Sequence, residues 1–117
     1  MSTPNPTPDR RETWRLIIHG RVQGVGYRQW LKRQAPKHDI NGWVRNRSDD
    51  TVEALLRGRK HDVHNLIAQT LNGPKNADVH EVTVTRSDVK PHSGFRVREN
   101  KTVETGLKTK VRRKLGR

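Results

Sequence analysis

Apolar and polar positions alternate along several short stretches of the chain. Trp14, Leu16 and Ile18 share one side of the first stretch, from 14 to 19, as in a strand with one buried face. The same alternation predicts further strands over 51–57, 82–84 and 95–97, and the turn before 51–57 predicts a strand over 41–47 that it joins to 51–57. Together these segments predict a sheet with one apolar face.

Two stretches between these strands carry apolar residues at helical spacing. The first set is Tyr27, Trp30, Leu31 and Ala35, and the second is Val63, Leu66, Ile67 and Leu71. We expect the first helix to start near Arg28 and to stop at Pro36, because proline disfavours helical geometry in the residue before it. The second is expected to end at Asn72-Gly73-Pro74.

The predicted order of elements is β-α-β-β-α-β with a short strand after it. Helices with a single apolar stripe and strands with one apolar face favour two layers. We therefore predict an α+β fold, the ferredoxin-like α/β sandwich, with two helices on one face of a mainly antiparallel sheet.

Composition places the core in the middle of the chain. The 117 residues allow one domain, and all five aromatic residues lie between positions 14 and 95. We predict a disordered N-terminal tail over 1–13, which lacks the apolar run of a signal peptide, and a domain over 14–98. Residues 99–117 are predicted to form a basic flexible tail.

The absence of cysteine excludes disulfides, thiolate catalysis and cysteine-based metal sites. No apolar run approaches the roughly 18 residues that cross a bilayer, so no membrane interaction and a cytoplasmic location are expected. His61 and His64 lie three residues apart without an evident third ligand, and we interpret them as a solvated pair.

The chain is strongly basic, with a formal net charge of +13. Residues 99–117 carry +5 of this charge and 14–98 carry +8. A basic terminal run is most often a solvated end, and we expect at most weak, non-specific binding of polyanions through it.

Residues 20–28 read Gly-Arg-Val-Gln-Gly-Val-Gly-Tyr-Arg between a predicted strand and a predicted helix. Glycines at 24 and 26 allow successive N–H groups to point inward, beside the positive end of the helix. Arg28 adds a planar fork that matches two phosphate oxygens. The segment predicts a phosphate-binding loop, with a tight strand-to-helix connection as the alternative. The candidate binding residues are Gln23, Gly24, Val25, Gly26 and Tyr27.

With Gly42-Trp43-Val44-Arg45-Asn46, this loop resembles the two signature segments of the acylphosphatase family. The resemblance extends to 52–54, 72–74 and 94–98, and so covers about 14–98. It implies a monomeric, metal-independent enzyme without a cofactor that hydrolyses small acyl phosphates to carboxylate and inorganic phosphate. It also implies that Arg28 holds the phosphate and that Asn46 positions the attacking water.

The chain departs from the family pattern near both signature segments. Asp50 stands in the turn after Asn46 where the family usually has glycine, so this turn needs another type or a left-handed aspartate. Pro36 and His38-Asp39 stand where the family commonly has a glycine-containing helix exit. Asn46 has an alternative role as a turn cap. We interpret Trp43 and Tyr27 chiefly as packing residues.

The main rival hypothesis is a basic ferredoxin-like module that binds nucleic acid, because the same sandwich serves RNA recognition. The expected pair of aromatic central strands is missing, since the first strand offers Trp14 and the third offers none. A regulatory module like the one that begins hydrogenase-maturation carbamoyltransferases is a third hypothesis, although their zinc-finger cysteines are absent here.

Overall fold

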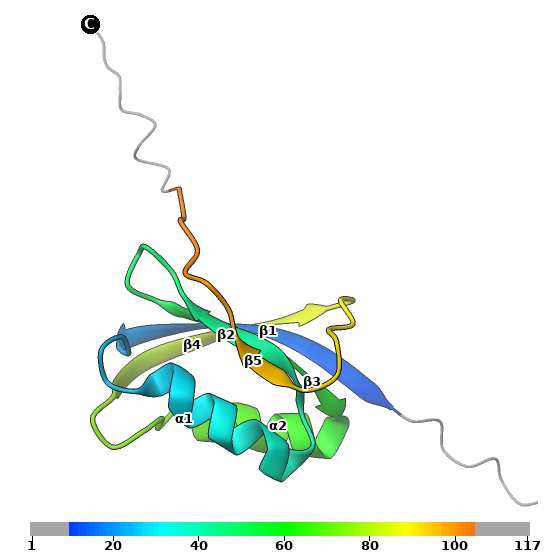
Figure 1. Ribbon diagram of the computed structural model, residues 1–117. Coiled ribbons are helices and arrows are strands. Elements are labelled where there is room, and N and C mark those ends of the chain that lie inside the picture. The colour runs from blue at the N-terminus through cyan, green and yellow to red at the C-terminus, as the bar shows by residue number, and fades with distance from the viewer. Residues whose placement is uncertain (1–9, 105–117) are drawn as a thin grey trace, which may run out of the picture.

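The computed structural model describes residues 10–104 of the chain. Its elements are β1 (Arg11–Arg21), α1 (Tyr27–Gln34), the 3-10 helix η1 (Ala35–His38), β2 (Asn41–Asn46), β3 (Val52–Arg59), α2 (Lys60–Thr70), β4 (Asp78–Ser87) and β5 (Phe95–Val97). Figure 1 shows both α-helices on one side of the sheet. The predicted order of elements is confirmed.

The five strands form one sheet in the order β4-β1-β3-β2-β5. The pairs β1–β3, β1–β4 and β2–β3 are antiparallel, and β2–β5 is parallel. This arrangement confirms the mainly antiparallel, ferredoxin-like sandwich. It also brings the C-terminal ends of β1 and β2 to the same end of the sheet.

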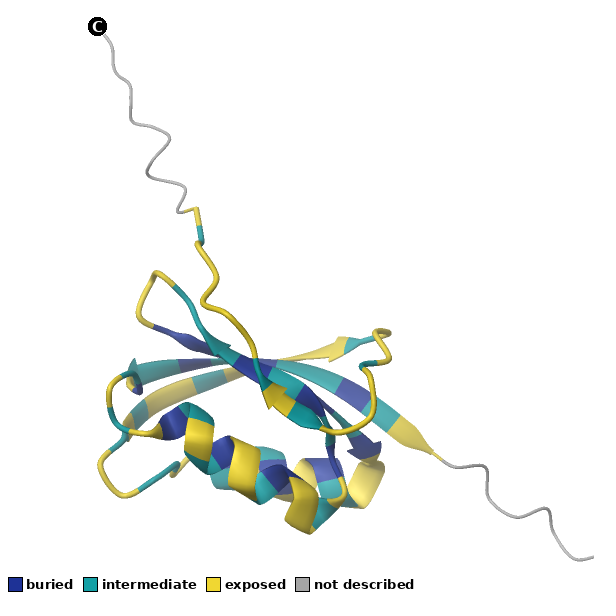
Figure 2. Ribbon diagram, viewed as in Figure 1, coloured by how far each residue is buried: buried dark blue, intermediate teal, exposed yellow. Residues whose placement is uncertain are grey.

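The hydrophobic core lies between the helices and the sheet, as Figure 2 shows by the buried residues that face each other there. Leu16 and Ile18 on β1 and Val52, Ala54 and Leu56 on β3 are all completely buried. These are the alternating residues that predicted the inner faces of the two strands. The helices contribute Tyr27, Leu31, Val63 and Leu66.

The first strand starts three residues before the predicted Trp14, at Arg11. These residues are polar, so no apolar alternation marks them, but their backbone pairs with Arg57, Gly58 and Arg59 of β3. Strand β4 is also longer than predicted, for the same reason. Backbone pairing with a longer neighbour extends both strands beyond their apolar residues.

Pro36 ends α1 as predicted, and the chain continues as η1 with this proline in its first turn. Asp39 then takes a left-handed conformation (φ 56°), the conformation that glycine adopts at many helix ends. Ile40 N–H donates to the carbonyl oxygen of Ala35 at 3.0 Å, which closes this helix exit.

Residues 1–9 and 105–117, and so most of both predicted tails, lie outside the described residues. Residues 99–104 are described, and Lys101 pairs with the end of β2: its N–H donates to Asn46 O, and its carbonyl accepts from Ser48 N–H, both at 2.9 Å. The bonded chain therefore extends past Arg98, where we drew the domain boundary. Neither α-helix in the described part is long and apolar enough to cross a bilayer.

Candidate active site

The loop between β1 and α1 has the geometry of an anion-binding turn. Gly24 (φ 72°) and Gly26 (φ 83°) both take left-handed conformations, and Gly26 is the N-cap of α1. This is the conformational freedom for which the two glycines were singled out. Among the hydrogen bonds of residues 10–104, none is donated by a backbone N–H of residues 23–28. These donors are available to a ligand at the helix N-terminus.

Arg28 lies in the first turn of α1 and is half-buried. This turn contains no acidic residue, and Arg28 has no ion-pair partner within the described chain. A cation at a helix N-terminus opposes the helix dipole. An anion bound between the loop N–H groups and the guanidinium would offset that cost.

Gln23 joins the loop to the turn between β2 and β3. Its side-chain Nε2 donates to the carbonyl oxygens of Arg47 and Thr51, both at 2.8 Å. The loop and the turn accordingly lie together at one end of the sheet (Figure 1). Because the Gln23 amide is engaged in this way, its backbone N–H is the group left for a ligand.

Asn46 is the last residue of β2 and pairs with Val52 of β3. Its carbonyl oxygen accepts from Lys101 N–H. Its side-chain Oδ1 is buried and has no hydrogen-bond partner in the described part of the chain. A buried amide oxygen without a partner is costly, so this atom is suited to accept a hydrogen bond from a bound water.

The turn that follows Asn46 is held by its own side chains. Asp50 takes the left-handed conformation (φ 71°). Of the two expectations for this turn, another turn type or a left-handed aspartate, the second is therefore confirmed. Asp49 accepts from Thr51 N–H at 3.2 Å, from Thr51 Oγ1 at 2.6 Å and from Arg47 Nη2 at 3.0 Å. Burial raises the pKa of Asp49, but these hydrogen bonds outweigh that effect and lower the pKa to about 2.

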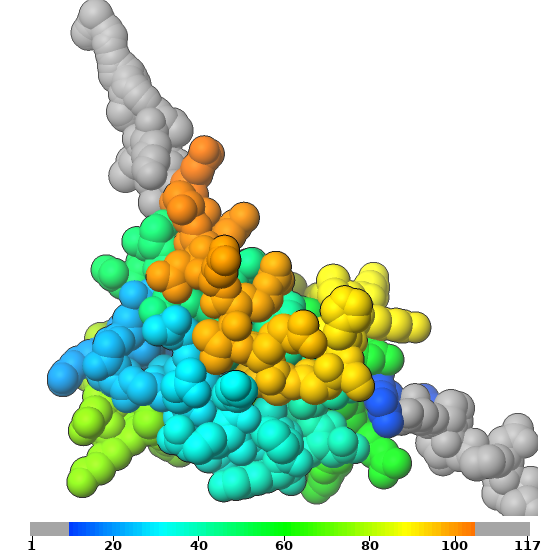
Figure 3. Space-filling view, viewed as in Figure 1, coloured from blue at the N-terminus to red at the C-terminus, as the bar shows by residue number. Residues whose placement is uncertain are grey.

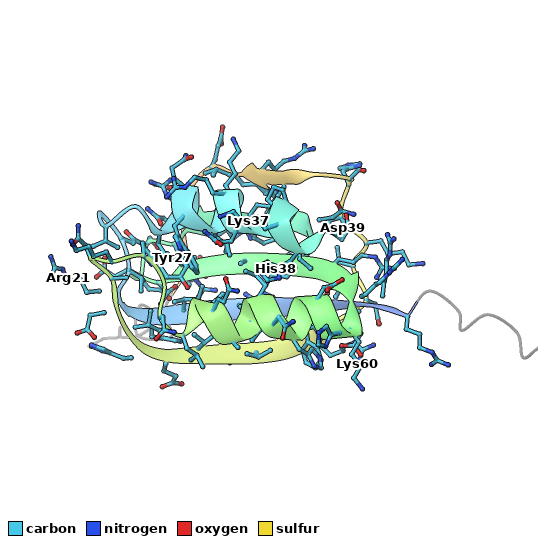
Figure 4. All side chains as sticks on the ribbon, turned by 90° about the horizontal axis from the view of Figure 1, so that it is seen from below. Arg21, Tyr27, Lys37, His38, Asp39 and Lys60 are labelled. Carbon is cyan, nitrogen blue, oxygen red and sulfur yellow. The ribbon has the colours of Figure 1, made fainter. Side chains whose placement is uncertain are left out.

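Two of the predicted binding residues have side chains that pack against the core. Val25 is partly buried there, and Tyr27 is almost completely buried. The Tyr27 hydroxyl donates to Thr70 O at 2.7 Å, and its ring meets Trp30 edge-on at 5.3 Å between centroids. Figure 4, seen from the helix side, shows Tyr27 between the two helices. Burial raises the pKa of Tyr27, so the phenol stays protonated. The backbone N–H groups of both residues donate no hydrogen bond within residues 10–104.

The two histidines on α2 have separate neighbours. His61 Nε2 lies 3.2 Å from Asn65 Nδ2, and His64 Nε2 lies 3.0 Å from Glu12 Oε1. No three histidine, aspartate or glutamate side chains between residues 10 and 104 group as metal ligands.

Sequence reasoning missed two parts of this site: the side-chain role of Gln23 and the contact of residues 101–103 with the β2–β3 turn. In the latter, Val103 N–H donates to Ser48 Oγ at 2.8 Å, 55 residues away. No local pattern signals either contact. The bonds of Asp49 to Thr51 are local, since an aspartate in a turn commonly accepts hydrogen bonds from the residue two positions on.

Comparisons with known proteins agree on one family. The family model described as Acylphosphatase matches residues 14–97. An acylphosphatase of Rhodopseudomonas palustris is 51% identical over 69 residues, which are 59% of this chain and 70% of the relative. The structure of an acylphosphatase from Coxiella burnetii has a TM-score of 0.75 at 29% identity, covering 80% of this chain and 100% of that one. For the acylphosphatase of Bacillus subtilis the TM-score is 0.71 at 34% identity, with 74% and 97% covered.

Proposed function

The chain belongs to the acylphosphatase family, and from this premise we propose that residues 23–28 bind the phosphate of an acyl phosphate while Asn46 positions the attacking water. The enzyme hydrolyses small acyl phosphates. The family thus favours an enzyme over the rival hypothesis of a module that only binds nucleic acid. The natural acyl group is not specified by these residues.

The observation that carries the proposal is a set of unengaged donors in one loop-helix junction. The backbone N–H groups of residues 23–28 make no hydrogen bond within the described chain, and Arg28 in the same loop-helix junction has no carboxylate partner. Such donors suit a dianion, because backbone N–H groups at a helix N-terminus bind phosphate and a guanidinium matches two of its oxygens. The Tyr27 ring holds this junction on the core.

Asn46 is proposed to act on the other reactant. The side-chain amide of Gln23 ties the phosphate loop to the turn that follows Asn46, and the Oδ1 atom of Asn46 is buried without a partner among residues 10–104. An oxygen in that position can accept a hydrogen bond from a water and hold it for in-line attack on phosphorus. Holding a reactant in the productive geometry can supply several kcal/mol of the barrier.

The reaction needs little further machinery, since a carboxylate is a good leaving group. Water adds to phosphorus, the bond from phosphorus to the carboxylate oxygen breaks, and the carboxylate leaves with the bonding electron pair. Charge in the loose transition state spreads over the equatorial phosphoryl oxygens, which the loop N–H groups and Arg28 would stabilise. A neutral amide is no strong base, so the proton of the water passes to a phosphate oxygen.

The test of this proposal removes the guanidinium. Arg28→Ala should lower kcat/KM for a synthetic aromatic acyl phosphate at least about hundredfold, measured in the presence of a chelator. Arg28→Lys should restore little, because a point charge cannot replace a planar fork.

Arg33→Ala is the matched control, because Arg33 is an exposed arginine of the same helix. It should leave the rate within about twofold of the wild type. Undiminished hydrolysis in Arg28→Ala, or equal losses in the Arg28 and Arg33 variants, would refute the assigned role.

We further propose that the enzyme is a cytoplasmic monomer. The cysteine-free sequence supports the cytoplasm, since a chain without disulfides does not need an oxidising compartment to fold. The proposed site supports the monomer, since all its groups come from one chain.

A further inference from the structure

The face of the sheet opposite the helices carries an excess of arginine. Val44 on β2 and Leu16 on β1 are fully buried against the helices, so their chain neighbours point to the other face. By this alternation the open face carries the arginines Arg15, Arg45, Arg57, Arg96 and Arg98 against the carboxylates of Glu53 and Glu81.

Trp43, which we interpret as a packing residue, is half-buried on this open face and lies outside the core cluster. The guanidinium carbon of Arg45 is 4.5 Å from the centre of its ring, and that of Arg98 is 4.9 Å away. Trp14, by contrast, packs against the core and meets His64 of α2. The open face therefore has an aromatic platform on β2 rather than on β1.

Two hollows flank this platform. One, of about 410 Å³, is lined by Gly42, Trp43, Val89, Lys90, Pro91, His92, Arg96 and Arg98. The other, of about 400 Å³, is lined by Arg45, Val97, Arg98, Glu99 and Asn100. Because Arg98 borders both, the hollows follow one another along β5. Figure 3 shows this edge: the segment before β5 and β5 itself lie side by side at the surface.

The cations of these hollows are largely uncompensated. Glu53 binds Arg15 at 2.6 Å and Arg45 at 2.8 Å, which neutralises that part of the face. Lys90, Arg96 and Arg98 are exposed and have no ion pair within residues 10–104. Glu99 contributes the one carboxylate among the residues that line the two hollows.

We propose that this edge of the open face, built from Trp43, Lys90, Arg96 and Arg98, is a binding site for single-stranded nucleic acid. It lies on the opposite side of the sheet from the loop of residues 23–28, because Val25 and Tyr27 pack on the core under the helices while Trp43, next to the buried Val44, points to the other face. The inference is independent of the proposed catalytic roles.

The geometry favours a single strand over other polyanions. Arg96 lies on β5 and Arg98 directly follows this strand, so their Cα atoms are about 7 Å apart, a spacing that suits contact with successive phosphates. A base exposed on a single strand can stack on an indole or a guanidinium plane, which the paired bases of a duplex cannot do. The backbone is fixed here, since Gly42 N–H donates to Gly94 O and Arg98 N–H donates to Val44 O, both at 2.9 Å.

The experiment measures binding of the full chain to a fluorescent 12-nucleotide RNA without secondary structure, by anisotropy over a range of salt concentrations. Arg96→Gln/Arg98→Gln should raise the Kd at least about tenfold and reduce the slope of log Kd against log salt by about 1.4, or 0.7 for each phosphate. Trp43→Leu should raise the Kd about tenfold and leave the slope unchanged, because stacking releases no counterions.

Arg33→Gln/Lys37→Gln is the matched control, since it removes the same charge from exposed positions on the helix side. It should change the Kd less than about twofold, and all these variants should keep acyl phosphate hydrolysis, which shows that they fold. Saturating inorganic phosphate at constant ionic strength should not displace the RNA.

Three results would overturn the proposal. One is an equal loss of binding in the control and the Arg96/Arg98 variant, which would assign binding to net charge. Another is displacement by inorganic phosphate, which would assign it to the phosphate loop. The third is unchanged binding in Trp43→Leu with equal affinity for duplex RNA, heparin or anionic phospholipid vesicles, which would show a general anion surface.

Discussion

At the residue scale, the two side chains proposed for catalysis both have polar groups without an ion-pair or hydrogen-bond partner in the described chain. The Arg28 guanidinium has no carboxylate near it, and Asn46 Oδ1 is buried without a donor. Burial of an unsatisfied polar group costs about 1–3 kcal/mol. Such a cost is typical of functional sites, where a ligand completes the hydrogen bonds.

The Asn46 amide is expected to affect the chemical step more than substrate binding. Asn46→Ala should lower kcat about hundredfold, with KM for a synthetic acyl phosphate within about threefold, because the water loses its acceptor while the phosphate donors remain. Steady-state kinetics measure both constants. Asn72→Ala, at an exposed position after α2, is the control and should alter neither. A large rise in KM with unchanged kcat in Asn46→Ala would contradict the role.

At the scale of elements, a buried carboxylate joins three strands. Glu53 of β3 is 3% exposed and binds Arg15 of β1 and Arg45 of β2. Burial raises the pKa of Glu53, but the hydrogen bonds and charges of the two guanidiniums outweigh it and hold that pKa below its ordinary value. The ion pairs thereby hold β2, which ends at Asn46, in register with the centre of the sheet.

Loss of this charge should destabilise the fold. Glu53→Gln keeps the shape of the side chain but leaves the guanidiniums of Arg15 and Arg45 without their carboxylate partner. We expect the free energy of unfolding to fall by about 3 kcal/mol. Urea denaturation at pH 7 measures it. Glu81→Gln on β4, an exposed glutamate, should change stability by less than about 0.5 kcal/mol. Equal stability of these two variants would show that the Glu53 pairs contribute nothing.

At the scale of the whole molecule, the sheet separates two environments. One face buries the core under the helices (Figure 2), and the other carries Trp43 with the guanidiniums of Arg45 and Arg98 over its ring. The loop after β1 is joined to the turn after β2 by Gln23, and the groups proposed for catalysis belong to the segments next to these two connections. This separation lets a basic surface coexist with the proposed phosphate site on one small domain.

The stability of the whole fold should depend on pH through the turn beside Asn46. Asp49 has a folded pKa of about 2, below its ordinary 3.8. A lowered pKa stabilises the folded state above 3.8, and the contribution is lost as pH falls towards 2. Asp49→Asn should therefore be less stable than the wild type above pH 4, and the two should converge near pH 2. Urea denaturation at several pH values measures this, and a difference independent of pH would contradict it.

Much of the fold could be predicted because its signals are local. The alternation in Leu16 and Ile18 and the stripe from Tyr27 to Ala35 report which side of each element is apolar. The polar start of β1 at Arg11 could not be predicted, because it depends on pairing with Arg59, 48 positions away. The same holds for Lys101, because no residue pattern around it predicts its hydrogen bonds to Asn46 and Ser48.

For this protein, the sequence by itself predicted the elements and the glycines of the loop, because periodicity and conformational freedom belong to neighbouring residues. The roles of Arg28 and Asn46 come from the resemblance to the family and are proposals. Only the tertiary structure decided that Gln23 joins the loop to the turn and that Trp43 faces away from the core. These outcomes depend on which strands pair and in what register, and register brings together residues whose separation along the chain gives no sign of contact.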